Sequence, residues 1–321
     1  MARIVVTRPL IEGGLSGLRE SHTVTVCDPP DGSSRSEEEL IALTDGADVL
    51  LSILADPVTE RLFEARSGLQ MVAQYAVGVD NIDLEAAEDH DVTVTHTPGV
   101  LTDATADMAW ALLLAVARHV PAADQHVRDG RFERWETTLM LGMELSRKTI
   151  GIVGLGRIGT AVARRALGFG MDVVYHNRHR ANPTIERQTS AQYVDLDDLL
   201  ATSDVVSLHC PHNEESHHLI DTAALERMKS SAILVNTARG PVVDENALVD
   251  ALETGEIAGA GLDVFEEEPN VHSGLLERDR VVLAPHLGSA TMDARMRMAQ
   301  MCTASIEAFL DGAENVPHRL V

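Results

Sequence analysis

Three glycines in the middle of the chain have the spacing of a turn that binds phosphate groups. Gly154, Gly156 and Gly159 follow an apolar run that begins at Thr149, and a helical stretch comes after them. In such a pattern the first glycine forms a tight turn, the second lets the backbone approach a pyrophosphate, and the third lets the helix lie close to the strand. The positive end of the helix dipole then faces the phosphates.

The context of these glycines favours a dinucleotide over the alternative, an ordinary glycine-rich turn. A second apolar run ends at Tyr175, so strand, helix and second strand follow in the order that a nucleotide-binding fold requires. We therefore predict that the dinucleotide is bound by the segment that comprises Gly154, Gly156, Arg157, Ile158 and Gly159.

The end of the second strand bears on the choice of coenzyme. An Asp or Glu about 20 residues beyond the glycines would accept hydrogen bonds from the adenosine ribose, but this chain has Asn177, Arg178, His179 and Arg180 there. A guanidinium group suits a 2′-phosphate in both charge and geometry. The turn therefore predicts a preference for NADP(H). A solvated basic turn is the alternative, and Asn177 could bind an unphosphorylated ribose, which leaves NAD(H) open as a second coenzyme.

Polar residues also end four successive strands that we predict in the second half of the chain. Because ligands of an open doubly wound sheet bind outside the carboxyl ends of its strands, we expect an active site there, with cofactor contacts from His209, Cys210, Pro211, Thr237 and Ala238. The clusters are His209-Cys210-Pro211, Thr237-Ala238-Arg239-Gly240, Asp263 followed on the same loop by Glu268-Pro269, and Pro285-His286.

Short apolar strands alternate with helical stretches along most of the chain, which is typical of a parallel sheet covered by helices on both faces. Before the glycines, helices are expected at 37–43 and 59–65 between strands at 4–7, 24–27, 49–54, 71–74 and 92–95. After the glycines, strands are expected at 173–175, 205–209, 233–236, 260–264 and 281–284.

Two long helical patterns suggest how the chain is divided. A helix at 102–120, ended by Pro121, would lead to the second unit, the polar segment 122–147 is interpreted as an arm and loop, and a last helix at 293–309 most simply returns to the first unit. We predict an α/β protein of two doubly wound parallel-sheet domains, Rossmann-like or flavodoxin-like, with the active site in the cleft between them. Residues 1–99 plus 288–321 would form a discontinuous substrate domain, and residues 100–287 the dinucleotide-binding domain.

The charge of the chain limits its partners. It has 321 residues with 50 acidic and 26 basic side chains, which gives a formal net charge of −24. Nucleic acid is not an expected partner, because binding to a phosphate backbone requires a basic surface. The acidic residues are spread along the chain, and salt screens their mutual repulsion, so we expect a protein of a high-salt cytoplasm.

Membrane, targeting and metal-binding patterns are not found in the sequence. The longest apolar run, Met108–Ala117, is far shorter than the roughly 20 residues that cross a bilayer. The N-terminus leads directly into a predicted strand. Cys27, Cys210 and Cys302 lack the spacing of metal ligands, so we expect no metal site and interpret them as small core residues in a reducing compartment.

Five motifs spread over essentially the whole chain resemble those of the D-2-hydroxyacid dehydrogenases. They are AVGVDNID (76–83), VGLGRIG (153–159), NTARGPVVDENAL (236–248), GLDVFEEEP (261–269) and APHLGSAT (284–291). The resemblance implies an NAD(P)-dependent oxidoreductase that acts on a 2-keto acid and D-2-hydroxy acid pair. It also implies a catalytic trio of Arg239, Glu268 and His286.

The chemistry of the reaction gives each member of this trio a role. Hydride transfer puts negative charge on the carbonyl oxygen, so a proton donor is needed there, and His286 changes its charge near neutral pH. Glu268 beside the imidazole would favour the imidazolium form. Arg239 has the geometry to hold the substrate carboxylate and polarise the carbonyl. Taken singly, each has a structural alternative: His286 as a loop histidine, Glu268 as one acid of an acidic run, and Arg239 as a surface cap.

The resemblance implies further contacts to the substrate and the cofactor. Backbone N–H groups of Val77 and Gly78 would bind the substrate carboxylate. We expect an apolar substrate pocket at Leu54, within the run 51–55, and at the arm around 135–143, with a buried strand as the alternative for 51–54. The nicotinamide side of the cofactor would be held by Thr105, Asp263, His286 and Gly288.

Two alternative functions stay open at this point. One is a short phosphoglycerate dehydrogenase, since no regulatory extension follows the last helix. The other is a corepressor-like protein that senses the nucleotide, although such a protein is expected to carry partner-recruiting extensions and this chain ends at Val321. The resemblance and the apolar surface of the central helix and arm also predict a homodimer.

Overall fold

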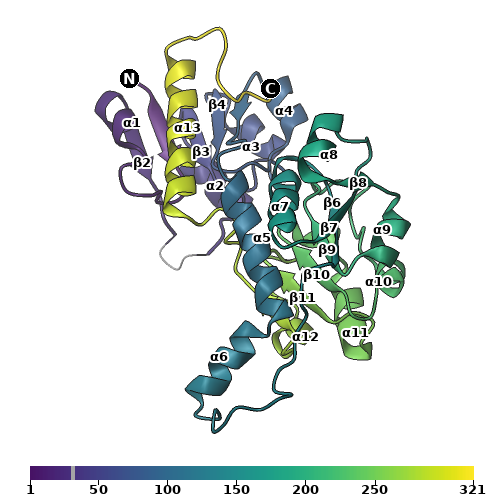
Figure 1. Cartoon of the computed structure of the whole chain (residues 1–321). Coiled ribbons are helices and arrows are strands. Elements are labelled where there is room, and N and C mark those ends of the chain that lie inside the picture. The colour runs from purple at the N-terminus through teal and green to yellow at the C-terminus, as the bar shows by residue number, and fades with distance from the viewer. Residues whose placement is uncertain (30–32) are drawn as a thin grey trace. The chain divides into compact units, whose positions relative to one another are not determined.

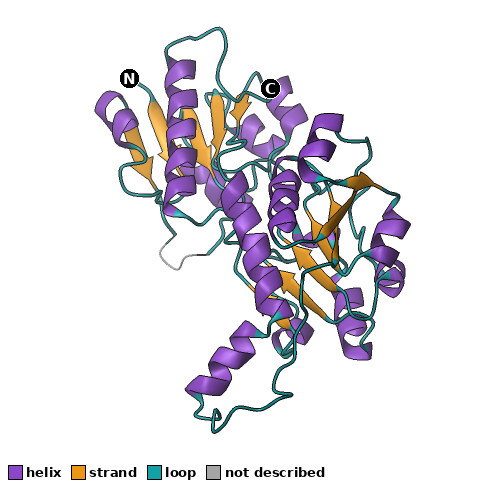
Figure 2. Cartoon of the chain, viewed as in Figure 1, coloured by secondary structure: helices purple, strands orange, loops and turns teal. Residues whose placement is uncertain are grey.

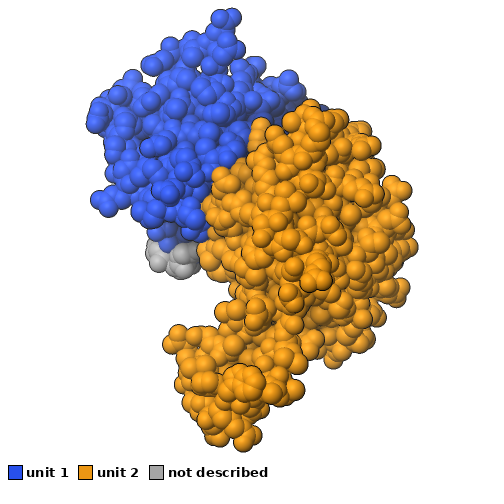
Figure 3. All heavy atoms as spheres, viewed as in Figure 1, with its two compact units in different colours: residues 1–101, 290–321 blue, residues 102–289 orange. Residues whose placement is uncertain are grey.

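The computed structural model describes residues 1–29 and 33–321, which form two compact units. The first unit comprises residues 1–101 and 290–321, and the second comprises residues 102–289 (Figure 3). Each unit has its own parallel sheet with helices packed on it (Figure 2). The predicted α/β class with two parallel sheets is therefore confirmed, and each predicted strand is present.

The sheet of the first unit has five parallel strands in the order β2-β1-β3-β4-β5. Every residue of β3 and β4 is buried, as expected for central parallel strands that are covered on both faces. The strands are β1 (Arg3–Val6), β2 (Thr23–Val26), β3 (Val49–Ser52), β4 (Met71–Gln74) and β5 (Thr93–Thr95). The helices are α1 (Ser16–Ser21), α2 (Glu37–Leu43), α3 (Glu60–Ala65), α4 (Leu84–Asp89) and α13 (Met292–Leu310).

The last helix, α13, packs on the first unit, although the whole second unit separates it in sequence from residues 1–101 (Figure 1). Tyr75 donates its hydroxyl hydrogen to the Arg295 carbonyl at 2.6 Å, and Thr303 donates to the Gly14 carbonyl at 3.1 Å. Cys302 of the same helix is buried against β4. The C-terminal helix thus completes one apolar layer of the first sheet.

The sheet of the second unit has seven parallel strands in the order β12-β11-β10-β9-β6-β7-β8. The chain adds β7 and β8 on one side of β6 and then returns to add β9 to β12 on the other (Figure 1). The carboxyl end of β6 is therefore the topological switch point, where doubly wound sheets bind ligands. The strands are β6 (Thr149–Val153), β7 (Asp172–His176), β8 (Gln192–Tyr193), β9 (Val205–Leu208), β10 (Ile233–Asn236), β11 (Gly259–Leu262) and β12 (Val281–Leu283).

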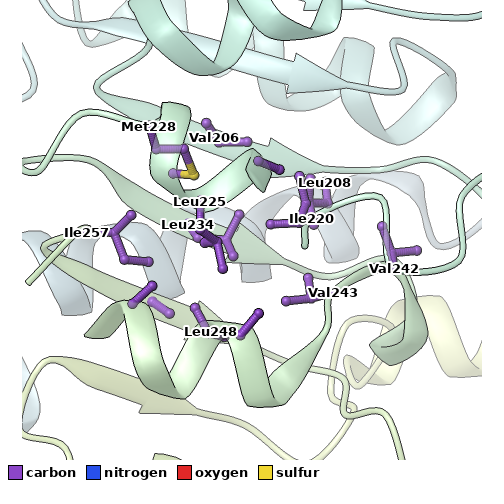
Figure 4. Packing of buried hydrophobic residues seen from close by; sticks show 14 of the residues in the cluster. Val206, Leu208, Ile220, Leu225, Met228, Leu234, Val242, Val243, Leu248 and Ile257 are labelled. Atoms are coloured by element: carbon purple, nitrogen blue, oxygen red, sulfur yellow. The ribbon is translucent and has the colours of Figure 1, made fainter. Parts of the chain in front are cut away.

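Two apolar layers enclose this second sheet. Along β9 the side chains alternate between them: Val205 belongs to the layer with α5 and α7, and Val206 to the layer with α10 and α11. Figure 4 shows the latter, in which Leu225 and Leu248 gather around Leu234 of β10. The helices are α5 (Thr102–Ala117), α6 (Val120–Arg128), α7 (Arg157–Gly168), α8 (Pro183–Thr189), α9 (Leu196–Thr202), α10 (Thr222–Arg227), α11 (Glu245–Thr254) and α12 (Ser273–Leu276), with a 3₁₀ turn, η1 (Gly240–Val242).

Two sequence predictions for the second unit are wrong. The helix expected at 102–120 ends at Ala117, since His119 has a left-handed backbone with φ of 53°. A further helix, α6, then occupies part of the segment that was expected to be irregular, and Pro121 lies in its first turn. Proline is tolerated there because the first-turn N–H groups have no intrahelical acceptor. Pro121 therefore lies at the start of a helix instead of ending one. The short strand β8 was not predicted from the sequence.

Candidate active site

The glycine loop after β6 has the backbone that the sequence pattern requires. Gly154 has φ of +96°, and a Cβ atom there would lie 2.6 Å from the Cys210 backbone nitrogen. A Cβ atom at Gly159 would lie 2.2 Å from the Gly154 carbonyl oxygen, so only glycine lets α7 approach the loop. At Gly156, by contrast, a Cβ atom would meet nothing within 4 Å. The loop is tight on its inner side and open at Gly156.

The open side of this loop fits a pyrophosphate. Gly156 is the N-cap residue of α7, and none of the described side chains caps that helix. The first turn of α7 therefore offers N–H groups and the positive end of its dipole to an anion. Because β6 lies at the switch point of the sheet, the residues present fit a dinucleotide bound across this loop.

The turn after β7 lies against the glycine loop. Asn177 accepts a hydrogen bond from the Leu155 backbone N–H at 2.6 Å, which ties the two segments together. Arg178 follows, and its Nη1 atom lies 2.9 Å from a carboxylate oxygen of Glu215 on the loop after β9. Both side chains of this ion pair are about two-thirds exposed, at 67% and 70%. Arg178 is thus available at the surface beside the glycine loop.

Arg180 is held more firmly than Arg178. Its guanidinium donates two hydrogen bonds to Glu186, at 2.7 and 3.2 Å, and the Tyr175 hydroxyl donates to the same carboxylate at 2.6 Å. The hydrogen bond and charge of Glu186 raise the pKa of Arg180. His179 is exposed between the two arginines. Of the two guanidinium groups, that of Arg178 is therefore the one that can more readily exchange its partner.

The loop after β9 places two neutral side chains behind the glycine loop. His209 shares hydrogen bonds with the Ser207 hydroxyl at 2.8 Å and the Thr237 hydroxyl at 3.5 Å, so its ring links the ends of β9 and β10. Burial lowers the pKa of His209 to about 3 and raises the pKa of the Cys210 thiol to about 11. Near pH 7 neither side chain supplies a charge or a reactive thiolate.

The turn after β10 carries Arg239, and Asn236 fixes that turn. The Asn236 side chain accepts the Ala238 N–H at 3.0 Å and donates to the Arg239 carbonyl at 2.9 Å. The Arg239 guanidinium donates to the Ala238 carbonyl at 2.7 Å. Asn236 stands at the start of a sequence motif, but its position in the motif indicates no role. Its part in placing Arg239 is evident only from these contacts.

Glu268 and His286 form the pair that the motifs imply. The His286 Nδ1 atom lies 2.9 Å from Glu268 Oε2, and Glu268 Oε1 accepts the Phe265 backbone N–H at 3.0 Å. Burial raises the pKa of Glu268, but the hydrogen bond and charge of His286, the Phe265 N–H and the Arg239 charge together hold it below its ordinary value. Glu268 is therefore an anion at neutral pH. The two side chains are 36% and 33% exposed, so a ligand can reach them.

Asp263 and Gly288 hold the turn that carries His286. The buried Asp263 carboxylate accepts the backbone N–H groups of Leu287 and Gly288, each at 2.6 Å, and its carbonyl accepts the His286 N–H at 2.8 Å. These bonds stabilise a left-handed backbone at His286, where φ is 53°. A Cβ atom at Gly288 would lie 3.3 Å from Thr105 Cγ2, so α5 brings Thr105 to the same point.

In the first unit, a buried polar network supports the loop of Val77 and Gly78. Gln74, at the end of β4, accepts a hydrogen bond from the Ser52 hydroxyl at 2.7 Å. It donates to the Asn81 side chain at 2.7 Å and to the Gly78 carbonyl at 3.3 Å. The sequence prediction did not include this network. Its one signal is that Ser52 and Gln74 are polar residues at the ends of otherwise apolar strands.

The residues expected to line an apolar pocket do not all lie at the surface. Leu51 is buried within β3, as the buried-strand alternative for this run states, whereas Leu54 follows the strand and is half-buried. Trp135 is 79% exposed on the segment between α6 and β6. Leu54 and the segment around Trp135 thus stay candidates for contact with a substrate or a partner.

Metal clusters and membrane-spanning helices are absent from the described part of the chain. Among residues 1–29 and 33–321, no group of three or more His, Cys, Asp or Glu side chains could hold a metal ion. Over the same residues, the structure contains no helix with the length and apolar character needed to cross a bilayer.

Comparison with known proteins places this geometry in a family. Residues 110–288 match the model of the NAD binding domain of D-isomer specific 2-hydroxyacid dehydrogenases. A glyoxylate reductase of Thermococcus litoralis is 46% identical over 99% of this chain and 96% of its own length. A solved structure from Thermus thermophilus superimposes with a TM-score of 0.92 at 43% identity, over 99% of this chain and all 100% of that one. The NADPH-dependent glyoxylate/hydroxypyruvate reductase of Sinorhizobium meliloti, solved with NADP and malonate, gives 0.86 at 31% identity, over 100% and 97%.

The chain belongs to the D-isomer-specific 2-hydroxyacid dehydrogenases. It is an NAD(P)-dependent enzyme that interconverts a 2-keto acid and a D-2-hydroxy acid by hydride transfer. The resemblance drawn from the five motifs is thus confirmed, and the enzyme is favoured over the corepressor-like alternative. The individual site residues stay predictions, although the structure brings Arg239, Glu268 and His286 to one edge of the second sheet.

Proposed function

We propose that the enzyme reduces a small 2-keto acid of the glyoxylate type, with His286 as the proton donor. The observation that carries this proposal is the 2.9 Å pair between His286 and the ionised Glu268, and the charge of Arg239 also favours the ionised form of Glu268. Similarity to glyoxylate reductases supports the substrate class. A short phosphoglycerate dehydrogenase is the alternative, and it would need a phosphate site as well.

Each member of the trio has a separate task in this proposal. When bound, a nicotinamide coenzyme would supply or accept the hydride at the substrate carbon. Arg239 binds the substrate carboxylate and stabilises charge on the carbonyl oxygen. His286 gives a proton from Nε2 to that oxygen, while Glu268 holds Nδ1 and favours the protonated ring. The backbone N–H groups of Val77 and Gly78 provide a second hold on the carboxylate.

We propose NADP(H) as the preferred coenzyme and NAD(H) as the second. The glycine loop and the first turn of α7 would bind the pyrophosphate, and Arg178 the adenosine 2′-phosphate. Support comes from the contact of Asn177 with the glycine loop at 2.6 Å, which places Arg178 beside it. The similar Sinorhizobium meliloti enzyme is NADPH-dependent. The contacts proposed around the rest of the cofactor are those of Thr105, His209, Cys210, Pro211, Thr237, Ala238, Asp263 and Gly288.

Initial rates over a set of keto acids test the proposed substrate class. Glyoxylate, hydroxypyruvate, pyruvate, 2-ketobutyrate and 3-phosphohydroxypyruvate are each reduced with NADPH and with NADH. Arg239 and the Val77 loop would recognise the carboxylate that all five share. We expect the highest kcat/KM with glyoxylate or hydroxypyruvate, because the similar enzymes are a glyoxylate reductase and a glyoxylate/hydroxypyruvate reductase. A clear preference for the phosphorylated acid would instead support phosphoglycerate dehydrogenase activity.

A pair of substitutions tests the coenzyme preference. In Asn177→Asp with Arg178→Ala, a carboxylate should accept the free ribose hydroxyls and repel a 2′-phosphate. A charge-assisted hydrogen bond contributes about 1.5–3 kcal/mol, so the ratio of kcat/KM for NADPH to that for NADH should fall about ten- to a hundredfold. In the wild type, high salt should lower this ratio, because salt screens the attraction between the guanidinium and the phosphate. A wild type that prefers NADH, or an unchanged ratio in the variant, would leave the basic turn as a solvated surface.

We also propose that the protein is a homodimer in a high-salt cytoplasm. Large apolar side chains are exposed on α6 and the segment after it, which is unusual for a surface that stays in water. Their exposed fractions are 58% for Val127, 58% for Phe132, 79% for Trp135 and 71% for Leu141. A second copy of this chain is the proposed partner for this surface.

A further inference from the structure

The ion pair of Arg178 and Glu215 joins two loops that flank the glycine loop. Arg178 follows β7, Glu215 lies on the loop after β9, and β6 lies between these two strands in the sheet. Neighbouring strands are about 4.8 Å apart, so a bridge between the loops of β7 and β9 has to pass across the carboxyl end of β6. That end carries the glycine loop. The pair therefore lies where the adenosine half of a dinucleotide is expected.

The loop after β9 fixes Glu215 in this position. The Asn213 side chain accepts the backbone N–H groups of Glu215 at 3.0 Å and of Ser216 at 3.1 Å. The buried Ser216 donates its hydroxyl hydrogen to the Pro211 carbonyl at 2.7 Å. The backbone at Glu215 is thus anchored while its side chain is exposed, so the carboxylate can meet Arg178 or turn into water.

We propose that Glu215 determines coenzyme specificity by opposing the adenosine 2′-phosphate, a role that rests on the proposed contact of Arg178 with that phosphate. The Glu215 carboxylate lies 2.9 Å from Arg178 Nη1 and occupies a donor that the phosphate would use. The phosphate has to displace this carboxylate and then lies beside its negative charge. A ribose hydroxyl can accept from Arg178 or donate to Glu215 with the pair in place. Glu215 therefore weakens NADPH binding and leaves NADH binding nearly unchanged. It thereby reduces the preference for NADPH over NADH that Arg178 creates.

A charge series at position 215 tests this inference. In Glu215→Gln the KM for NADPH should fall about three- to tenfold, since an exposed ion pair and the repulsion of a nearby dianion are both removed. In Glu215→Lys it should fall further. The KM for NADH should stay within about twofold, and the difference between the coenzymes should shrink as salt rises. The control is Glu214→Gln, which removes the same charge from an exposed neighbour that forms no ion pair within the described residues.

The outcomes separate this inference from the coenzyme proposal beneath it. If Arg178→Ala raises the KM for NADPH but Glu215→Gln changes it no more than Glu214→Gln does, the coenzyme proposal stands and the inference is overturned. A parallel change for NADPH and NADH also overturns it. If Glu215→Gln lowers the KM for NADPH while Arg178→Ala has no effect, Glu215 repels the phosphate but Arg178 is not its partner, and the coenzyme proposal fails. If neither variant has an effect, both are wrong.

Discussion

Replacing Asn236 should cost both stability and catalysis, because its side chain fixes the turn that carries Arg239. Asn236 is 1% exposed, and its amide makes two hydrogen bonds, at 2.9 Å to the Arg239 carbonyl and at 3.0 Å from the Ala238 N–H. In Asn236→Ala the Ala238 N–H loses its partner, and the Arg239 carbonyl keeps only the Val242 backbone N–H at 3.3 Å.

The size of the effect follows from these two bonds. Leaving a buried donor or acceptor without a partner costs about 1–3 kcal/mol. One buried group, the Ala238 N–H, is left without a partner, and Ala238 is 8% exposed, so we expect the free energy of unfolding to fall by about 1–3 kcal/mol. Release of the turn also frees the Arg239 guanidinium. A misplacement on the order of 1 Å can cost about a hundredfold in rate, so kcat/KM for the keto acid should fall by roughly that factor.

Urea unfolding and initial rates measure the two effects on the same preparation. Asn236→Asp refines the test, because it keeps an acceptor for the Ala238 N–H but sets a carboxylate oxygen against the Arg239 carbonyl. The control is Asn182→Ala, which removes the N-cap hydrogen bond to Thr184 at 2.8 Å in the same unit. That change should cost about 1 kcal/mol and leave kcat/KM unchanged. If Asn236→Ala loses stability but no more activity than the control, Arg239 does not depend on Asn236.

Four further predictions concern the trio and the dimer. His286→Ala should lower kcat about 10²–10⁴-fold with little change in coenzyme KM, and near-normal turnover would exclude it as the proton donor. Reduction needs a proton on the ring, so loss of the neighbouring negative charge in Glu268→Gln should move the alkaline fall in kcat/KM to lower pH. An unchanged profile would remove Glu268 from the mechanism. Folding lowers the pKa of Glu268, so the ionised carboxylate stabilises the folded protein above the unfolded value of 4.5, and this stabilisation is lost in acid. The difference in free energy of unfolding between the wild type and Glu268→Gln should therefore close as pH falls. Light scattering should show a dimer in concentrated salt, dissociation at low salt and a monomer for Trp135→Asp; a wild-type monomer in salt would contradict the proposal.

The sequence predicted best those features that depend on local backbone constraints. Gly154 and Gly159 could be identified because one needs a positive φ and the other a close contact within the same loop. The strands could be identified because burial on both faces of a parallel sheet makes their residues uniformly apolar. Since motifs at the ends of those strands share one sheet edge, the meeting of Glu268 with His286 also followed from the sequence.

Features that depend on distant partners could not be predicted in this way. Arg178 looks the same in the sequence whether or not a carboxylate from 37 residues further on pairs with it. The role of Gln74 likewise depends on Ser52 and Asn81, which come from different segments of the first unit. The helix that begins at Val120 was missed because Pro121 was expected to end a helix, whereas proline is well tolerated in the first turn of one.

The position of the catalytic side chains depends on the residues beneath them. Asn236 holds the Arg239 turn and Asp263 holds the His286 turn, and the Asp263 N–H donates to the Asn236 carbonyl at 2.9 Å. Asn236 and Asp263 are therefore bonded to each other at the ends of the neighbouring strands β10 and β11, whose register is set by burial on both faces of the sheet. The distance between the proposed carboxylate-binding group and the proposed proton donor is thus fixed by strand pairing, which lets both side chains stay partly exposed to a substrate without losing their alignment.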